Sequence, residues 1–157
     1  MRFTNCPPAL LSREERGGWG KVRWGMSVEE VLAAYPDRAQ RVDPEEKLAD
    51  GTVIAARLEE QAIGARTFRI RFLFEGGKLA LVSARTPQDV YAPAESYDEL
   101  QGLFRRELGP PAAVDADDAL IDMRQTRWVV GRTAVDLKYI PGVLAVVYHP
   151  TTAQPRP

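Results

Sequence analysis

The alternation of apolar and polar positions predicts a helix followed by several strands, and it predicts this arrangement twice. In the first half, Ser27 and Glu30 have the spacing of a capping box, in which each side chain hydrogen-bonds the backbone of the other residue. An apolar stripe at helical spacing follows, made of Val28, Val31, Leu32 and Tyr35. We expect this helix to end at Pro36, because a residue that precedes proline avoids the helical conformation.

The second half repeats this helix start. Ser96 and Glu99 again have the spacing of a capping box. The apolar stripe that follows consists of Tyr97, Leu100, Leu103, Phe104 and Leu108. A glycine followed by two prolines, at 109–111, predicts the end of this second helix.

Period-two alternation predicts strands after each helix. Within 67–74, for example, Phe68, Ile70 and Phe72 face one side and arginines face the other. The expected strands are 52–60, 67–74 and 78–84 in the first half and 120–130, 133–140 and 143–149 in the second. Turn residues join neighbouring strands at Gly76-Gly77, Gly131-Arg132 and Pro141-Gly142.

These elements predict an α+β fold: a tandem helix–β–β–β repeat that forms an antiparallel sheet of about six strands, with two helices packed on one face. Hairpin turns, not helical crossovers, join the strands, which disfavours a doubly wound α/β fold. We expect residues 1–23 to be an N-terminal arm, 24–149 a single domain and 150–157 a C-terminal tail. Repeat one covers 24–86 and repeat two covers 96–149.

Two short motifs resemble a known family. The first is Trp24-Gly25-Met26-Ser27, followed by Glu29, Glu30 and Val31, and the second is Trp128 followed by Thr133, Val135 and Leu137. The pattern over 22–149 resembles the fold of the β-lactamase inhibitory protein and of small lipoproteins of outer-membrane assembly. This resemblance implies a tandem repeat of helix-plus-sheet units. Its motifs specify a helix start and a packed strand, and they imply no particular binding site.

Composition and charge limit the classes of partner. The 157 residues are 45% hydrophobic and 27% charged, which is typical of one globular domain with a real core. Lysine and arginine (21) are balanced by aspartate and glutamate (22), so nucleic acid is not the expected partner. The longest apolar runs, such as 143–148, are too short to cross a bilayer, so we expect no transmembrane segment.

The only cysteine, Cys6, excludes an intrachain disulfide and a cysteine-based metal site. Because it lies beside two prolines in a stretch without periodicity, we expect a free thiol on the N-terminal arm. The start of the sequence lacks the apolar region of a signal peptide. This indicates the cytoplasm if Met1 is the native start, and the periplasm if a leader has been removed.

The sequence contains no motif of catalysis, metal binding or nucleotide binding. His149, the only histidine, is expected on the surface at a strand end, since no partner for catalysis or a metal can be named from sequence. The acidic run at 115–118 lacks the spacing of a calcium loop and is interpreted as a solvated loop. The glycines at 17–20 lack the ending of a phosphate-binding loop. No catalytic residue, metal or cofactor is therefore expected.

The face of the sheet away from the helices is the candidate binding surface. In the first half we expect Arg69 and Arg71 to point outward together with Ala80, Val82 and Ala84. In the second half the outward residues are Asp136, Lys138, Ala145 and Val147, with Arg127 expected opposite Asp136. Trp128 is expected to point inward, opposite Val135. Trp19 has no periodic partner, so it either folds back onto the domain or binds another protein. The candidate partner-binding residues are Arg69, Arg71, Arg127, Asp136, Lys138 and Trp19.

These features favour a non-catalytic protein-interaction module that binds another protein through the open sheet face or the N-terminal arm. A simpler interpretation of the face is a solvated surface, on which long arginine stems cover small apolar residues. Two other functions stay open. One is a small hydrolase that uses carboxylates in a cleft between the repeats. The other is a carrier of a small ligand or lipid, which needs an apolar cavity.

Overall fold

A computed structural model describes residues 17–117 and 123–151. The elements of the first half are β1 (Gly18–Trp19), β2 (Val22–Arg23), α1 (Val28–Ala34), β3 (Gln40–Lys47), β4 (Val53–Ile63), β5 (Arg66–Glu75) and β6 (Lys78–Arg85). The elements of the second half are α2 (Ala94–Leu108), β7 (Ala113–Asp117), β8 (Met123–Val130), β9 (Thr133–Ile140) and β10 (Val143–Pro150).

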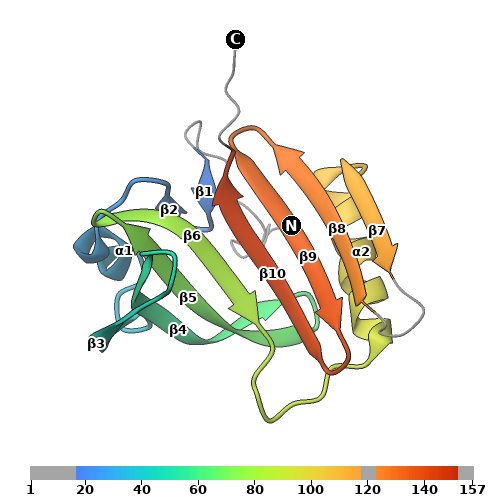
Figure 1. The fold of residues 1–157 in the computed structure, drawn as a ribbon, viewed down its shortest axis with the longest axis horizontal. Helices are drawn as coiled ribbons and strands as arrows, with labels where there is room; N and C mark the ends of the chain where they lie inside the picture. The colour runs from blue at the N-terminus through green and yellow to red at the C-terminus, as the bar shows by residue number, and fades with distance from the viewer. Residues whose placement is uncertain (1–16, 118–122, 152–157) are drawn as a thin grey trace, which may run out of the picture.

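Eight of the strands form one antiparallel sheet with the order β3-β4-β5-β6-β10-β9-β8-β7, and β1 and β2 form a separate hairpin (Figure 1). Strands β6 and β10 are neighbours, so the two halves join at the centre of the sheet. The expected α+β class and the antiparallel sheet are confirmed. The expectation of six strands with two helices packed on one face is wrong, because each half contributes four strands to the sheet. The internal repeat stays a prediction.

The two additional strands in the sheet, β3 and β7, lie at its edges. Strand β3 is exposed along almost its whole length and includes Pro44, so no period-two pattern marks it. Strand β7 includes residues 115–117 of the acidic run that we interpreted as a loop. Pairing with β8 satisfies its backbone without any apolar alternation. Asp118, and residues 120–122 of the expected strand 120–130, lie outside the described residues.

The capping-box prediction is confirmed for α1 and wrong for α2. Ser27 Oγ accepts a hydrogen bond from the Glu30 amide at 3.1 Å, and Glu30 Oε1 accepts one from the Ser27 amide at 2.9 Å. Helix α2 begins earlier than expected, at Ala94 with Pro93 at its N-cap. The fixed φ of proline suits a helix start. Ser96 therefore lies in the first turn, where its hydroxyl donates to the Pro93 carbonyl at 2.5 Å.

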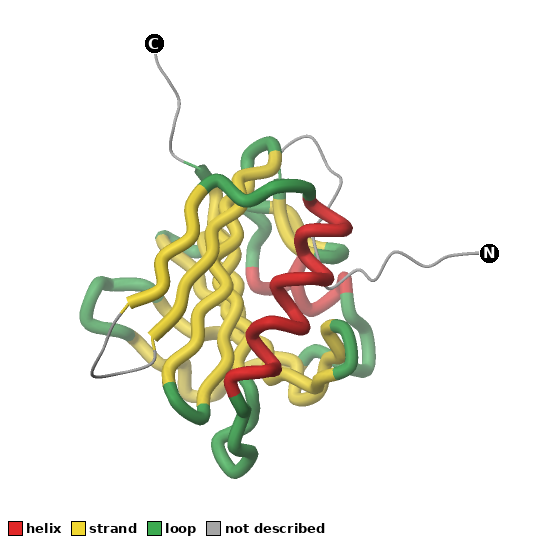
Figure 2. Tube along the Cα trace, turned by 90° about the vertical axis from the view of Figure 1, so that its right-hand side faces the viewer, coloured by secondary structure: helices red, strands yellow, loops and turns green. Residues whose placement is uncertain are grey.

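The core lies between one face of the sheet and the elements that cover it. Helix α2 runs along this side of the strands, as Figure 2 shows, and contacts β8 and β9. Its Phe104 packs edge-on against Trp128. Helix α1 contacts β4 at the other end of the sheet. Neither helix of the described part of the chain is long and apolar enough to span a lipid bilayer.

The hairpin β1–β2 inserts Trp19 into the core between the two halves. Trp19 is fully buried, and its ring lies against those of Tyr35, Phe72 and Tyr148. From Gly17 onward, the segment that we expected to be an arm is thus packed against the sheet. The rest of that segment, including Cys6, lies outside the described residues. So do residues 152–157 of the expected tail, whereas Pro150 belongs to β10.

The sheet curls around the core, so the β4–β5 turn reaches α2. Arg66 pairs with Glu99 of α2 at 3.2 Å. The turn residue Gly64, with φ +64°, lies so close to Leu103 that an added Cβ would be 3.1 Å from that side chain. This curl brings the distal end of the first half onto the helix of the second half.

A bulge between β5 and β6 changes which residues of β6 face outward. Leu73 pairs with Leu81 but Phe74 pairs with Leu79, so Ala80 is an extra residue in β6. The expectation that Val82 and Ala84 point outward is therefore wrong. Both are fully buried, opposite Phe72 and Ile70 on the core side. The residues of β6 that face outward are Leu81, Ser83 and Arg85.

Candidate functional site

The open face of the sheet, on the side away from α2, carries the candidate residues in two rows. Strand pairing places one row in the order Arg57, Arg71, Ser83, Val147, Asp136, Arg127. The second row runs Arg69, Arg85, Ala145, Lys138, Gln125. From β5 to β8 the rows extend about 19 Å, since neighbouring strands lie about 4.8 Å apart. The structure thus brings together all of the predicted site residues except Trp19.

Arg127 and Asp136 form the expected cross-strand pair. The guanidinium donates from Nε to Oδ1 at 2.6 Å and from Nη2 to Oδ2 at 2.8 Å, which is a bidentate arrangement. The Asp136 side chain is 4% exposed, whereas that of Arg127 is 44% exposed. The arginine therefore covers the carboxylate and keeps its own outer edge in solvent.

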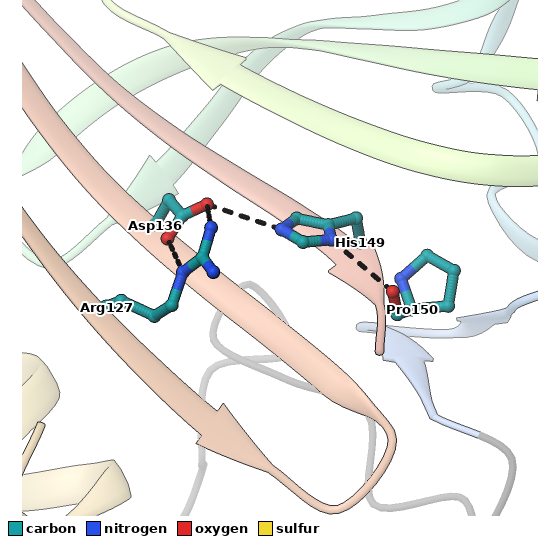
Figure 3. Close-up of polar contacts among 4 residues, drawn as sticks. All are labelled: Arg127, Asp136, His149 and Pro150. Atoms are coloured by element: carbon teal, nitrogen blue, oxygen red, sulfur yellow. Dashed lines mark hydrogen bonds and ion pairs between the residues drawn. The ribbon is translucent and has the colours of Figure 1, made fainter. Parts of the chain in front are cut away.

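His149 contacts the same carboxylate from the neighbouring strand. Its Nε2 lies 3.3 Å from Asp136 Oδ2, and its Nδ1 lies 3.4 Å from the Pro150 carbonyl (Figure 3). Burial on its own would raise the pKa of Asp136. The hydrogen bonds from His149 and Arg127, together with the positive guanidinium, instead lower that pKa well below its usual range. Asp136 is thus a fully ionised carboxylate with its oxygens already engaged.

The first-half end of the open face holds a pocket lined by three arginines. A hollow of about 80 Å³ is bordered by Arg69, Arg71, Arg85, Thr86 and Gln88. Thr86 is fixed to β10, because its amide donates to the Leu144 carbonyl at 3.0 Å and its hydroxyl accepts from the Leu144 amide at 3.2 Å. The pocket wall is therefore part of the sheet. No acidic residue lines the hollow.

The positive charges around this pocket are only partly balanced. Glu59 lies 2.9 Å from the Arg57 guanidinium and 3.8 Å from that of Arg69. Neither Arg71 nor Arg85 forms an ion pair or a side-chain hydrogen bond with another residue of the described ranges. The pairs Arg57–Arg71 and Arg69–Arg85 each place two cations directly opposite one another. Such an arrangement costs free energy in the absence of an anion.

An apolar strip on β10 separates the arginine pocket from the Arg127–Asp136 pair. Val143, Ala145 and Val147 face outward along this strand and are half-buried. Val129 and Ile140 lie toward the edges of the same face and are about half exposed, at 51% and 44%. Small apolar side chains thus extend the open face beyond the cationic pocket.

None of the three tryptophans lies on the open face. Trp19 is buried in the core, which is the first of the two alternatives that we considered for it. Trp128 lies opposite Val135 and is buried, as predicted. Trp24 is half-buried on the other side of the sheet, where its indole Nε1 donates to Thr133 Oγ1 at 3.1 Å.

Sequence reasoning missed Arg85, because period-two counting from the Gly76-Gly77 turn gives it the opposite face. The bulge at Ala80 inverts that count. No residue of β6 signals the bulge, since alanine fits either register. A pocket of three guanidinium groups is suited to a compact anion. No cluster of three or more histidine, cysteine, aspartate or glutamate residues that could hold a metal ion occurs in 17–117 or 123–151.

Comparisons with known proteins add no identification. No family model, no curated protein and no solved structure matches this chain. The resemblance to the β-lactamase inhibitory protein and to small outer-membrane-assembly lipoproteins therefore stays a prediction.

Proposed function

We propose that this protein is a non-catalytic binding module that docks an acidic protein surface on the open face of its sheet. The observation that carries this proposal is two pairs of opposed arginines on the solvent-facing side of the sheet, Arg57–Arg71 and Arg69–Arg85. Among the described residues, Glu59 is the only carboxylate that forms an ion pair with any of them. Like charges at directly opposed positions destabilise a sheet. An acidic partner removes this repulsion when it binds.

The apolar strip supports a protein as the partner. Ala145 lies between Arg85 and Lys138, and Val147 follows it on the same face of β10. A polypeptide can therefore bury apolar side chains on this strip where its acidic groups meet the basic ones. Arginine is enriched in protein interfaces because its stem packs and its guanidinium makes directed hydrogen bonds. The net charge of the whole chain does not reveal the basic open face, because the value of −1 also includes acidic residues elsewhere.

The alternative functions receive less support from the geometry. A carboxylate hydrolase needs two carboxylates close together, and the partners of buried Asp136 are Arg127 and His149. A small-molecule site typically encloses about 300–1,000 Å³. The arginine pocket, at about 80 Å³, is too small to serve as the cavity of a carrier.

Affinity capture from a lysate of the source organism tests the proposal. The baits are the wild type, Arg69→Glu/Arg71→Glu on the open face, and Arg105→Glu/Arg106→Glu on the exposed last turn of α2 as the matched control. We expect a stoichiometric partner to bind the wild type and the control and to be lost from the open-face variant. Circular dichroism verifies that each bait is folded. A partner that stays bound to the folded open-face variant contradicts the proposal.

A further inference from the structure

The arginine pocket has the chemistry of a site for one compact anionic group. Its lining presents the guanidinium groups of Arg69, Arg71 and Arg85, with Gln88 as a further donor, and contributes no carboxylate. Guanidinium groups bind planar oxyanions through paired N–H···O bonds. Arg71 and Arg85 retain their donors for a ligand, because no other residue in the described ranges pairs with them.

The surroundings of the pocket indicate where its anion comes from. The hollow of about 80 Å³ has room for one small group. Ala145 lies beside Arg85 in the same row, so the apolar strip begins at the edge of the pocket. Side chains of an extended polypeptide alternate between its two faces. A polypeptide that places an acidic side chain in the pocket therefore continues onto Ala145 and Val147 with apolar side chains two residues away. A carboxylate that belongs to a polypeptide uses both features, whereas a free anion uses only the first.

We propose that the pocket formed by Arg69, Arg71 and Arg85 binds a carboxylate side chain of the partner, within an extended segment that has apolar residues two positions before and after the acidic one. This inference rests on the proposed function and gives it a recognition rule. The pocket anchors an aspartate or glutamate, and the strip on β10 selects apolar residues two positions away from it.

Titration of the isotope-labelled full chain with synthetic peptides, followed by NMR, tests the rule. The probe is acetyl-Val-Ser-Glu-Ser-Val-amide, in which the glutamate and both valines share one face when the peptide is extended, and its matched control replaces the glutamate with glutamine. We expect the acidic peptide to shift the Nε–H resonances of Arg69, Arg71 and Arg85. We also expect it to bind at least about tenfold more tightly than the glutamine peptide, as for the loss of a charge-assisted hydrogen bond.

Protein variants locate the site. Arg71→Gln/Arg85→Gln should weaken binding of the acidic peptide by roughly tenfold or more. The matched control, Arg105→Gln/Arg106→Gln on the exposed last turn of α2, removes the same charge away from the open face. It should change the affinity by less than about threefold, since it removes only long-range attraction. Inorganic phosphate and a ten-nucleotide oligothymidylate are titrated in parallel as probes for other anions.

Each outcome of these experiments either supports or contradicts the recognition rule. Shifts at the three arginines that disappear in the double variant support it. Equal binding of the two peptides overturns it, as does tighter binding of phosphate or of the oligonucleotide at the same arginines. If the acidic peptide fails but Arg69→Glu/Arg71→Glu still abolishes partner capture, the open face is a binding surface and the carboxylate rule is wrong. If both experiments fail, the proposed function is wrong as well.

Discussion

Arg69 and Arg85 lie directly opposite each other on neighbouring strands, β5 and β6. Two positively charged side chains at such positions repel, and an opposite-charge or apolar pair would be more stable by a few tenths of a kcal/mol to about 1 kcal/mol. Arg57 and Arg71 repeat this arrangement one strand away. The fold thus holds a concentration of positive charge on one face at some expense of stability, which is typical of a surface that functions by binding.

Replacing Arg85 with glutamine should therefore stabilise the protein. We expect the Arg85→Gln variant to gain about 0.2–1 kcal/mol in the free energy of unfolding at low salt, because the repulsion from Arg69 is removed. The gain should largely vanish at about 1 M salt, where charges are screened within about 3 Å. Urea denaturation at the two salt concentrations measures both effects. Arg106→Gln on α2 is the control, and a loss of stability in Arg85→Gln at low salt would contradict this prediction.

Replacing Asp136 with asparagine should destabilise the protein by about 1–2 kcal/mol at neutral pH. The substitution removes the charge-assisted hydrogen bonds to Arg127, whose exposed guanidinium regains water and so limits the loss.

The same variant should show a defined pH dependence. Because the folded state lowers the pKa of Asp136, its stabilisation is complete above the ordinary aspartate pKa of about 3.9 and is lost as the pH falls through the lowered folded-state value. The difference in unfolding free energy between wild type and Asp136→Asn should thus shrink as the pH falls below roughly pH 4. Urea denaturation from about pH 5 downward measures it, and a difference that grows as the pH falls below about 4 would contradict the assignment.

Removing the indole of Trp19 should cost about 3–5 kcal/mol of stability, as for other large-to-small substitutions in a core. Trp19→Ala leaves a cavity between Tyr35, Phe72 and Tyr148 and detaches the hairpin β1–β2 from the sheet. Thermal and urea unfolding measure the loss. Trp19→Phe fills part of the cavity and should lose clearly less. A near-neutral Trp19→Ala variant would show that the hairpin does not close the core.

The hydroxyl of Thr133 should contribute measurably to the position of the N-terminal hairpin. Its Oγ1 accepts hydrogen bonds from the Gly18 amide and the Trp24 indole, both at 3.1 Å. Thr133→Val keeps the side-chain shape and leaves two donors without an acceptor, so we expect a loss of about 1–3 kcal/mol. Hydrogen exchange of the Gly18 amide should accelerate in this variant. Thr133→Ser retains the acceptor, and similar exchange in the two variants would exclude the proposed role.

Local patterns in the sequence were sufficient for much of the sheet. The expected strands 67–74, 133–140 and 143–149 match β5, β9 and β10 to within a residue at each end. A half-buried strand has a period of two, and glycine permits the positive φ of a hairpin turn, so both signals are local. Counting residues outward from the Gly131-Arg132 turn then gave the strand pairing. It correctly placed Arg127 opposite Asp136 and Trp128 opposite Val135.

The edge strands and the start of α2 could not be predicted from local sequence patterns. Strand β3 is paired on one side only and buries almost nothing, so its residues carry no apolar alternation. At α2 the proline at the N-cap, not the capping-box motif at Ser96, sets the first turn. In each case the backbone conformation is decided by a neighbour in space or by one residue outside the motif.

The composition of the candidate site was decided by the tertiary structure. Period-two counting fails beyond a bulge, because one extra residue at Ala80 inverts every later side chain of β6. Packing of Val82 and Ala84 on Phe72 and Ile70 selects that register, and it turns Arg85 outward beside Arg69. The sequence alone determined the six inner strands of the sheet and the arginines that they carry. Only the packed sheet determined that these arginines share one pocket. Strand pairing brings together positively charged residues that lie apart in the sequence.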